Sequence, residues 1–149
     1  MILGIDHIEI IVHDLDVHVA FYEKLGFQVL KRTTHHGGSV EVRLPGEHQL
    51  TIELHQVGAE EVCGVNHIAF GVHDVAASKE ELLEKGIKFE HNPPKYGGPV
   101  LAHSTGRWLA NFRSPDGGRL QLTSVEREAT SSAPDQDPWA PPTAGTTKT

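Results

Sequence analysis

An internal repeat constrains this chain more than any other feature of its sequence. Residues 6–15 match residues 66–75 at an offset of 60, and each segment carries a histidine in its second position, His7 and His67. Apolar, largely β-branched residues and a His-Asp pair follow in both copies. Self-similarity at a fixed spacing indicates a repeated structural unit. We therefore expect two related modules, at residues 1–57 and 65–126, joined by a linker at 58–64.

Within each module the pattern predicts the order strand, helix and three more strands. Each copy opens with an alternating apolar run, continues to an aspartate suited to cap a helix, and reaches a glycine suited to end it. Proline and glycine turns then separate three further strand-like runs. The helices are expected at 16–25 and 76–85, and the strands at 5–12, 27–35, 39–44 and 50–57, then at 67–73, 87–91, 107–113 and 119–125.

Strand alternation places four polar residues on one face of the expected sheet. His7, Glu53, His67 and Gln121 each lie between apolar neighbours, so their side chains point away from the face that the helices would cover. Two such half-sheets facing one another would enclose all four side chains. The sequence predicts an α+β fold in which two βαβββ modules form a cup-shaped, partly open mixed β-sheet barrel with the helices outside.

These four side chains suit a divalent metal ion. Two imidazoles, one carboxylate and one amide oxygen bind first-row ions and leave positions open for water or substrate. An isolated histidine on a polar strand face is usually a surface residue, but here it recurs at the equivalent point of both modules. Gln121 is the weakest member, because a neutral amide is a poor ligand. The donors do not distinguish zinc, nickel, manganese and iron.

Further polar residues are candidates for a substrate pocket. His55 follows Glu53 on the same strand face, and matching the third strands of the modules aligns Arg43 with Arg113, next to Asn111. Arginine binds carboxylate or phosphate through two parallel hydrogen bonds. Surface arginines on an exposed strand are the alternative reading.

Two segments depart from the repeat. Residues 92–99 form a Pro/Gly-rich insertion of eight residues, which we expect to be a long loop, either a lid over a site or a solvated excursion. Residues 127–149 contain almost no large apolar side chains and are expected to be a disordered tail.

Composition excludes several classes of partner. The formal net charge is −7 with no cluster of Lys or Arg, which argues against nucleic acid or an anionic membrane surface. Cys63 is the single cysteine and cannot form an internal disulfide, and no apolar run is long enough to cross a membrane. We expect a cytoplasmic protein that binds a small molecule, in a homodimer whose cups are closed either within one chain or by exchange of modules.

Five segments of the two modules form a recognisable set: residues 6–8 (DHI), 21–27 (FYEKLGF), 52–54 (IEL), 66–70 (NHIAF) and 114–117 (SPDG). Together they resemble the vicinal-oxygen-chelate superfamily, which includes glyoxalase I, bleomycin-resistance proteins and extradiol dioxygenases. In glyoxalase I-like members, the positions matching His7, Glu53, His67 and Gln121 bind the metal, although the last is usually a glutamate.

The resemblance implies a glyoxalase I-like lyase or isomerase that acts on a small oxygenated substrate through a metal-stabilised enediolate. Glu53 is the remaining carboxylate of the set and would carry the proton. One alternative is an iron(II) extradiol-type dioxygenase, in which Glu53 would replace the carboxylate of the final strand. The other is a non-catalytic protein that sequesters an antibiotic or similar ligand.

Overall fold

A computed structural model describes residues 1–34, 38–90, 99–102 and 105–128. They form one mixed sheet of eight strands with the order β2-β3-β4-β1-β5-β8-β7-β6. The first module contains β1 (Gly4–Val12), α1 (Leu15–Lys24), β2 (Gln28–Thr33), β3 (Ser39–Arg43) and β4 (Thr51–Gln56). The second contains β5 (Gly64–Val72), α2 (Val75–Glu84), β6 (Val100–Ala102), β7 (Arg107–Arg113) and β8 (Arg119–Ser124).

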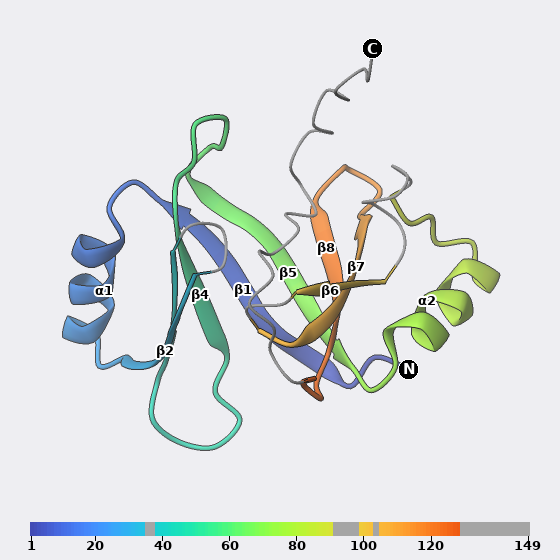
Figure 1. Ribbon diagram of the computed structural model, residues 1–149, viewed down its shortest axis with the longest axis horizontal. Helices are drawn as coiled ribbons and strands as arrows, with labels where there is room; N and C mark the ends of the chain where they lie inside the picture. Colours follow the sequence, from blue (N-terminus) through green and yellow to red (C-terminus); the bar gives the residue numbers. More distant parts are fainter. Residues whose placement is uncertain (35–37, 91–98, 103–104, 129–149) are drawn as a thin grey trace, which may run out of the picture.

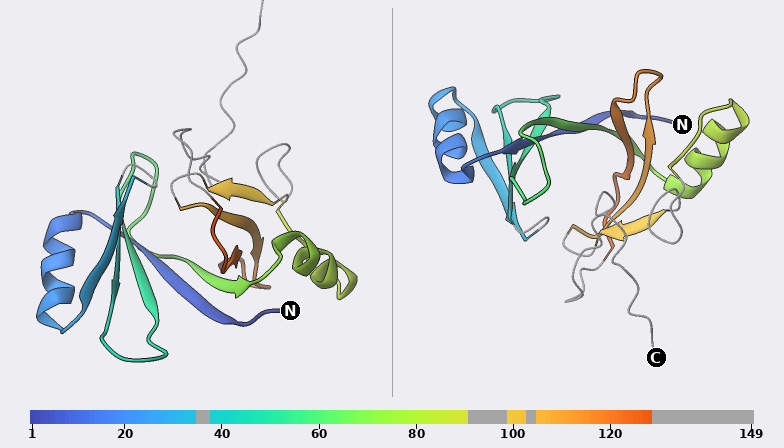
Figure 2. Two further views of the ribbon diagram at one scale, coloured as in Figure 1. Left: turned by 60° about the horizontal axis from the view of Figure 1, so that its bottom comes forward. Right: turned by 90° about the horizontal axis from the view of Figure 1, so that it is seen from above.

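The two modules repeat the same topology and meet along one central pair of strands. β1 pairs in parallel with β4, and β5 pairs in parallel with β8, as the crossover through a helix requires. β1 and β5 then pair with each other in antiparallel orientation. The sheet curls between the helices, which lie at its two opposite ends (Figures 1 and 2). The predicted α+β cup of two βαβββ modules is therefore confirmed. The homodimer, with cups closed within one chain or by exchange of modules, stays a prediction.

Both helices begin and end where the sequence indicates. The side chains of Asp14 and Asp74 accept hydrogen bonds from the backbone N–H groups of Val17 and Ala77, at 3.0 and 2.9 Å. These bonds satisfy N–H groups that have no partner within the helix. After each helix the chain reverses through a glycine with positive φ, 98° at Gly26 and 84° at Gly86.

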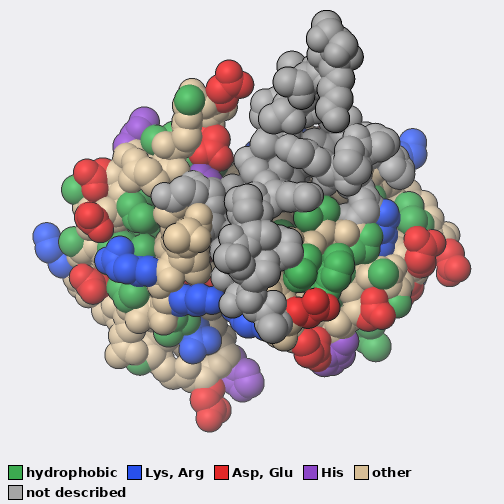
Figure 3. Space-filling model, viewed as in Figure 1, with side chains coloured by type: hydrophobic (Ala, Val, Ile, Leu, Met, Phe, Trp, Pro, Cys, Tyr) green, Lys and Arg blue, Asp and Glu red, His purple; other side chains and the backbone are tan. Residues whose placement is uncertain are grey.

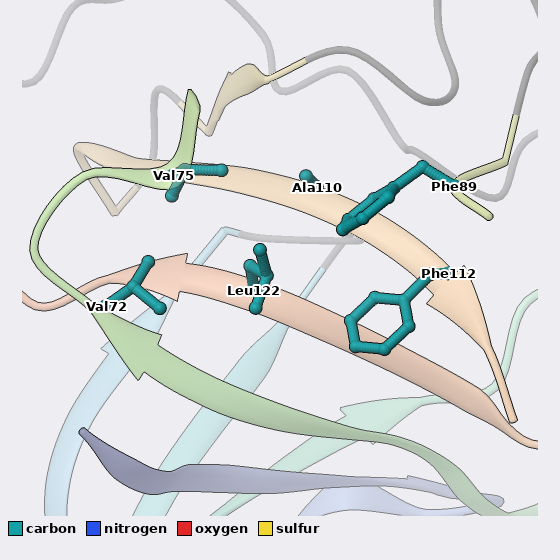
Figure 4. Close-up of a cluster of buried hydrophobic side chains, with 6 residues drawn as sticks. All are labelled: Val72, Val75, Phe89, Ala110, Phe112 and Leu122. Carbon is teal, nitrogen blue, oxygen red and sulfur yellow. The ribbon is translucent and has the colours of Figure 1, made fainter. Parts of the chain in front are cut away.

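Each helix packs on the outer, apolar face of its own module, so the molecule has two hydrophobic cores. In the first module α1 packs against β3 and β4, and the buried residues are Val12, Val19, Val40, Val42 and Leu54. In the second module α2 packs against β7 and β8 around Val72, Val75, Phe89, Ala110, Phe112 and Leu122 (Figure 4). Because the outer face is filled in this way, the opposite face of each strand is left to line the cup.

The expected strand at 87–91 is wrong. Its one ladder contact is an isolated bridge between Phe89 and Phe112. β6 pairs instead with the other end of β7, where Val100 lies opposite Leu109. The eight-residue insertion explains the difference, because it interrupts the segment that corresponds to β2 of the first module. Residues 91–98, which include all of the insertion except residue 99, lie outside the described residues.

The expected module boundaries and the expected tail stay predictions. β5 already begins at Gly64, the last residue of the proposed linker. The start of the tail is attached to the second module: the backbone N–H of Glu128 donates to the carbonyl of Gly106, and a guanidinium N–H of Arg127 donates to that of Thr105. Residues 129–149 lie outside the described residues. None of the described helices has the length and apolar character needed to cross a membrane.

Candidate metal centre

The four residues predicted as metal ligands lie around one inner pocket. They come from the four central strands, with His7 on β1, Glu53 on β4, His67 on β5 and Gln121 on β8. All four are buried, with exposed fractions between 3% and 7%. The two imidazole Nε2 atoms are 3.3 Å apart, and Nε2 of His7 is 3.6 Å from Oε2 of Glu53.

Strand register brings these side chains together. In the β1–β4 pair Glu9 lies opposite Glu53, and in the β1–β5 pair Glu9 lies opposite His67. His7 precedes Glu9 by two residues and therefore points to the same face. β8 adds Gln121 beside Ala69 of β5. A sheet closed along β1 and β5 thus concentrates polar side chains from both modules at its centre.

His7 is held through a chain of charged groups that crosses between the modules. Oδ2 of Asp6 accepts a hydrogen bond from Nδ1 of His7 at 2.7 Å. Asp6 also accepts two hydrogen bonds from the guanidinium of Arg107 on β7, at 2.8 and 2.6 Å, and Nε of Arg107 donates to the carbonyl of Ser124 at 2.7 Å. This arrangement occupies Nδ1 of His7 and presents Nε2 to the pocket, as metal-binding histidines require.

The same contacts shift the pKa values of both groups. Burial alone would raise the pKa of Asp6, but hydrogen bonds from His7 and Arg107 and the charge of Arg107 hold it well below its usual value. Burial alone would lower the pKa of His7, but its hydrogen bond to Asp6 and the nearby carboxylates of Glu53 and Glu9 raise it above 6.5. Without a metal ion, the Asp6–His7 pair is therefore stabilised in its charged form.

His67 has different neighbours. Glu9 is fully buried, and its Oε1 lies 3.9 Å from Nδ1 of His67. The amide of Asn66 donates to the same carboxylate at 2.6 Å and accepts a hydrogen bond from Arg119 at 2.7 Å. Glu9 belongs to β1, so His67 is also supported by a residue of the other module.

The donor set fits a divalent ion. Ligand atoms bound at about 2.0–2.1 Å from one ion lie roughly 3–3.4 Å from each other. The distances of 3.3 and 3.6 Å from Nε2 of His7 to its two neighbours are close to that spacing. Within the described part of the chain no three His, Cys, Asp or Glu side chains form a complete ligand cluster as they stand. Nε2 of His7 thus forms one pair of neighbouring donor atoms with His67 and another with Glu53, and Gln121 lines the same pocket.

The space around the centre has two compartments. The inner pocket has a volume of about 20 Å³, which suits a single ion or water molecule. An adjoining outer cavity of about 260 Å³ shares His7, Glu41 and Arg107 with it. Of these two compartments, the outer cavity is the one with room for an organic molecule.

The four residues predicted for a substrate pocket are not brought together. Arg43 lines the outer cavity. Asn111 is buried and accepts a hydrogen bond from the Gln121 amide N–H at 3.1 Å, so the amide oxygen is the atom of Gln121 that would serve as a ligand. His55 is buried and bonds to Glu61 at 2.8 Å, outside both compartments. Arg113 bonds to Glu90 and to the Gly117 carbonyl, also outside both.

Sequence reasoning missed three residues of this centre as site residues. Strand alternation places Glu9, two residues after His7, on the same face of β1, so the sequence contains a signal that could have identified it. Asp6 precedes His7 directly, but adjacency in a strand usually means opposite faces. Arg107 lies 101 positions from its partner Asp6, and only the fold reveals that contact.

Comparison with known proteins identifies the family. The model of the Glyoxalase/Bleomycin resistance protein/Dioxygenase superfamily matches residues 4–122. The chain belongs to this superfamily. It is 34% identical to the uncharacterized protein YwkD of Bacillus subtilis (strain 168), over 82% of this chain and 97% of YwkD. It is 30% identical to a probable lactoylglutathione lyase of Synechocystis, over 78% of this chain and 91% of that protein.

A solved structure supports the fold of this superfamily member. Streptomyces coelicolor methylmalonyl-CoA epimerase, in complex with 2-nitronate-propionyl-CoA, aligns with a TM-score of 0.66 and 24% identity. The alignment covers 83% of this chain and 98% of the epimerase. At that identity the likeness concerns the architecture alone.

Proposed function

We propose that this protein is a metal-dependent isomerase or lyase that moves a proton on the carbon next to a carbonyl group of a small oxygenated substrate. His7, His67 and Glu53 would hold a divalent ion, with the amide oxygen of Gln121 as a fourth ligand. The observation that carries the proposal is the convergence on Nε2 of His7 of a second imidazole at 3.3 Å and a carboxylate at 3.6 Å. The relatives' names, lactoylglutathione lyase and methylmalonyl-CoA epimerase, agree with this class of reaction.

The chain's own groups can carry the proton. When bound, a divalent ion would supply Lewis-acid polarisation of the substrate carbonyl. The Glu53 carboxylate would accept the proton from the adjacent carbon and return it to a neighbouring position, so the reaction needs no external oxidant. Burial of Glu53 excludes bulk water and strengthens its electrostatic effect. Glu41 lies opposite Glu53 in the β3–β4 pair and lines both compartments, so it is another carboxylate that a substrate could reach.

Metal content is the first test. We expect about one divalent ion per chain in the purified protein, measured by inductively coupled plasma mass spectrometry, and none in the His7→Ala, His67→Ala double variant. A His73→Ala variant is the matched control, because His73 lies on the surface and pairs with Glu126. Absence of metal from the wild-type protein, even after incubation with zinc, nickel, manganese and iron(II), would refute the proposal.

A second test separates binding from proton transfer. Lactoylglutathione and methylmalonyl-CoA, suggested by the relatives, would be incubated with the protein in D₂O and followed by NMR for deuterium at the carbon next to the carbonyl. We expect Glu53→Gln to lose exchange by at least about a hundredfold, in the range of a lost general base. Glu41→Gln should retain metal and most of the exchange. If only Glu41→Gln abolished exchange, Glu41 and not Glu53 would be the base.

The two alternatives make different predictions in the same experiments. An iron(II) extradiol-type dioxygenase would copurify with iron and consume oxygen with a catechol. A sequestering protein would bind a ligand without turnover or metal. The paired histidines disfavour the second alternative, and Gln121 on the final strand disfavours the first, because it replaces the expected carboxylate.

A further inference from the structure

The outer cavity contains an unusual concentration of arginine. Arg43, Arg107 and Arg127 line it, which is half of the six arginines in the chain. The chain as a whole has a net charge of −7, so these arginines form a local excess of positive charge in an acidic protein. Figure 3 shows several Lys and Arg side chains over the first module and the middle of one face, with acidic side chains over both modules.

Ion pairing within the described residues distinguishes Arg43 and Arg127 from Arg107. Arg107 is committed to Asp6, Arg32 pairs with Asp16 at 3.6 Å, and Arg113 pairs with Glu90. Among the described residues, no carboxylate forms an ion pair with Arg43 or Arg127. The remaining arginine, Arg119, bonds to Asn66. Of the three arginines that line the outer cavity, Arg43 and Arg127 thus have no acidic partner among the described residues, whereas Arg107 pairs with Asp6.

The geometry of the cavity leaves these guanidinium groups available to a ligand. One Nη of Arg127 donates to the carbonyl of Thr105 at 2.9 Å, which fixes one edge of the group and leaves its other donors. Arg43 ends β3, and its side chain is exposed. The acidic groups of the cavity are Asp6, which Arg107 neutralises, and Glu41. Among the described lining residues, Arg43 and Arg127 therefore face one carboxylate, Glu41, that is not already neutralised, and this balance of charge favours an anion.

We propose that Arg43 and Arg127 bind a carboxylate or phosphate group of the substrate in the outer cavity. Guanidinium binds either group through parallel hydrogen bonds. The inner pocket of about 20 Å³ admits only the reacting atoms, so the anionic group lies in the outer cavity and orients the substrate toward His7 and Glu53. The assignment of this anion to a substrate rests on the proposed function, whereas anion binding itself does not.

The test uses the full chain freed of metal with a chelator. Succinate and inorganic phosphate would each be titrated by calorimetry and by thermal shift at constant ionic strength, with neutral succinamide as the matched probe. We expect saturable binding of one or both anions and none of succinamide. Arg43→Gln and Arg127→Gln should each weaken anion binding by about tenfold or more, the effect of losing a charged hydrogen bond. Arg32→Gln, which removes an arginine outside the cavity, should leave it unchanged.

Several outcomes overturn the inference. Equal binding of succinate and succinamide would show that charge is not recognised, and wild-type affinity in Arg43→Gln and Arg127→Gln would show that these residues are not the site. Absence of saturable binding of both succinate and phosphate would also refute the proposal. Arg43→Lys keeps the positive charge but loses the planar guanidinium that forms two parallel hydrogen bonds. If this variant melts like the wild type, an anion affinity between those of the wild type and Arg43→Gln would show that the loss comes from recognition and not from misfolding. Because metal is absent throughout, failure of the metal-centre proposal would not change these results.

Discussion

In the first module Asp6 precedes the candidate ligand histidine, whereas in the second module Asn66 occupies the same position of the repeat. Asp6 is charged and bonds to Arg107, which belongs to the second module. Asn66 is neutral and donates to Glu9, which belongs to the first. The repeat thus places both histidines by the same strand geometry, but each is supported by a different residue from the opposite module. The repeat therefore determines where the two histidines lie, but the residues that hold each histidine in place are not equivalent in the two modules.

The largest expected effect comes from removing one histidine at a time. Both His7→Ala and His67→Ala should weaken binding of zinc or manganese by more than about a hundredfold, because each removes a direct ligand. The measurement is calorimetric titration of the metal-free protein. Equal losses would support a shared ion, whereas wild-type affinity in either variant would exclude that histidine from the site.

The two cores offer a comparison of stability. Leu54 and Leu122 occupy equivalent positions of the repeat and are both fully buried. Leu54→Ala and Leu122→Ala should each lower the free energy of unfolding by about 2–5 kcal/mol, through lost burial and a residual cavity. Denaturant titration followed by fluorescence and circular dichroism would measure this. A second transition in only one variant would show that the modules unfold separately.

The supporting residues should differ in the size of their effect. Asp6→Asn removes the charged partner of His7 and should weaken metal binding by about 10–100-fold, as for other groups that orient a ligand histidine. Asn66→Ala should weaken it by about tenfold or less, because Glu9 itself remains beside His67. Affinity would be measured by competition with a chromophoric chelator. A larger loss in Asn66→Ala than in Asp6→Asn would reverse the comparison between the modules.

The final strands of the modules differ as well, since Glu53 on β4 corresponds to Gln121 on β8. Gln121→Glu would make the centre more symmetrical and add a negative charge to the ligand set. We expect affinity for divalent metal to rise by about tenfold, because affinity increases with ligand charge. Asn111→Ala, which removes the Gln121 partner without adding charge, serves as the control. Unchanged affinity in Gln121→Glu would place residue 121 outside the ligand set.

The smallest effect concerns pH in the metal-free protein. The raised pKa of His7 contributes stability that is present below pH 6.5 and is lost as the pH rises through its folded pKa. The lowered pKa of Asp6 contributes stability present above its ordinary value of 3.8 and lost as the pH falls toward its folded pKa. Asp6→Asn should flatten both dependences in urea titrations across this range. Metal affinity should instead increase with pH, because the ion displaces the proton of His7.

Much of this architecture could be predicted from local patterns. The repeat gave the order of elements, and Asp14 and Asp74 marked both helix starts. Alternation along β1, β4, β5 and β8 was sufficient to place His7, Glu53, His67 and Gln121 around one pocket. Their role as ligands stays a prediction.

What failed depends on contacts between distant parts of the chain. The strand expected at 87–91 was wrong because an insertion divides that segment, and periodicity contains no information about a divided strand. Alternation also treated Arg43 and Arg113 alike, but Glu90 and the Gly117 carbonyl hold Arg113 outside the cavity. Arg107 was missed because its partner is in the other module.

The division of the cavity into two compartments has a consequence for how such a protein changes under selection. The four candidate donors of the inner pocket are buried on the four central strands, where a substitution disturbs the sheet, whereas Arg43 and Arg127 are exposed. Surface substitutions usually alter stability by no more than about 0.5 kcal/mol. Under the proposed anion site, substrate preference could therefore diverge between descendants of one gene while the buried candidate ligands remain unchanged.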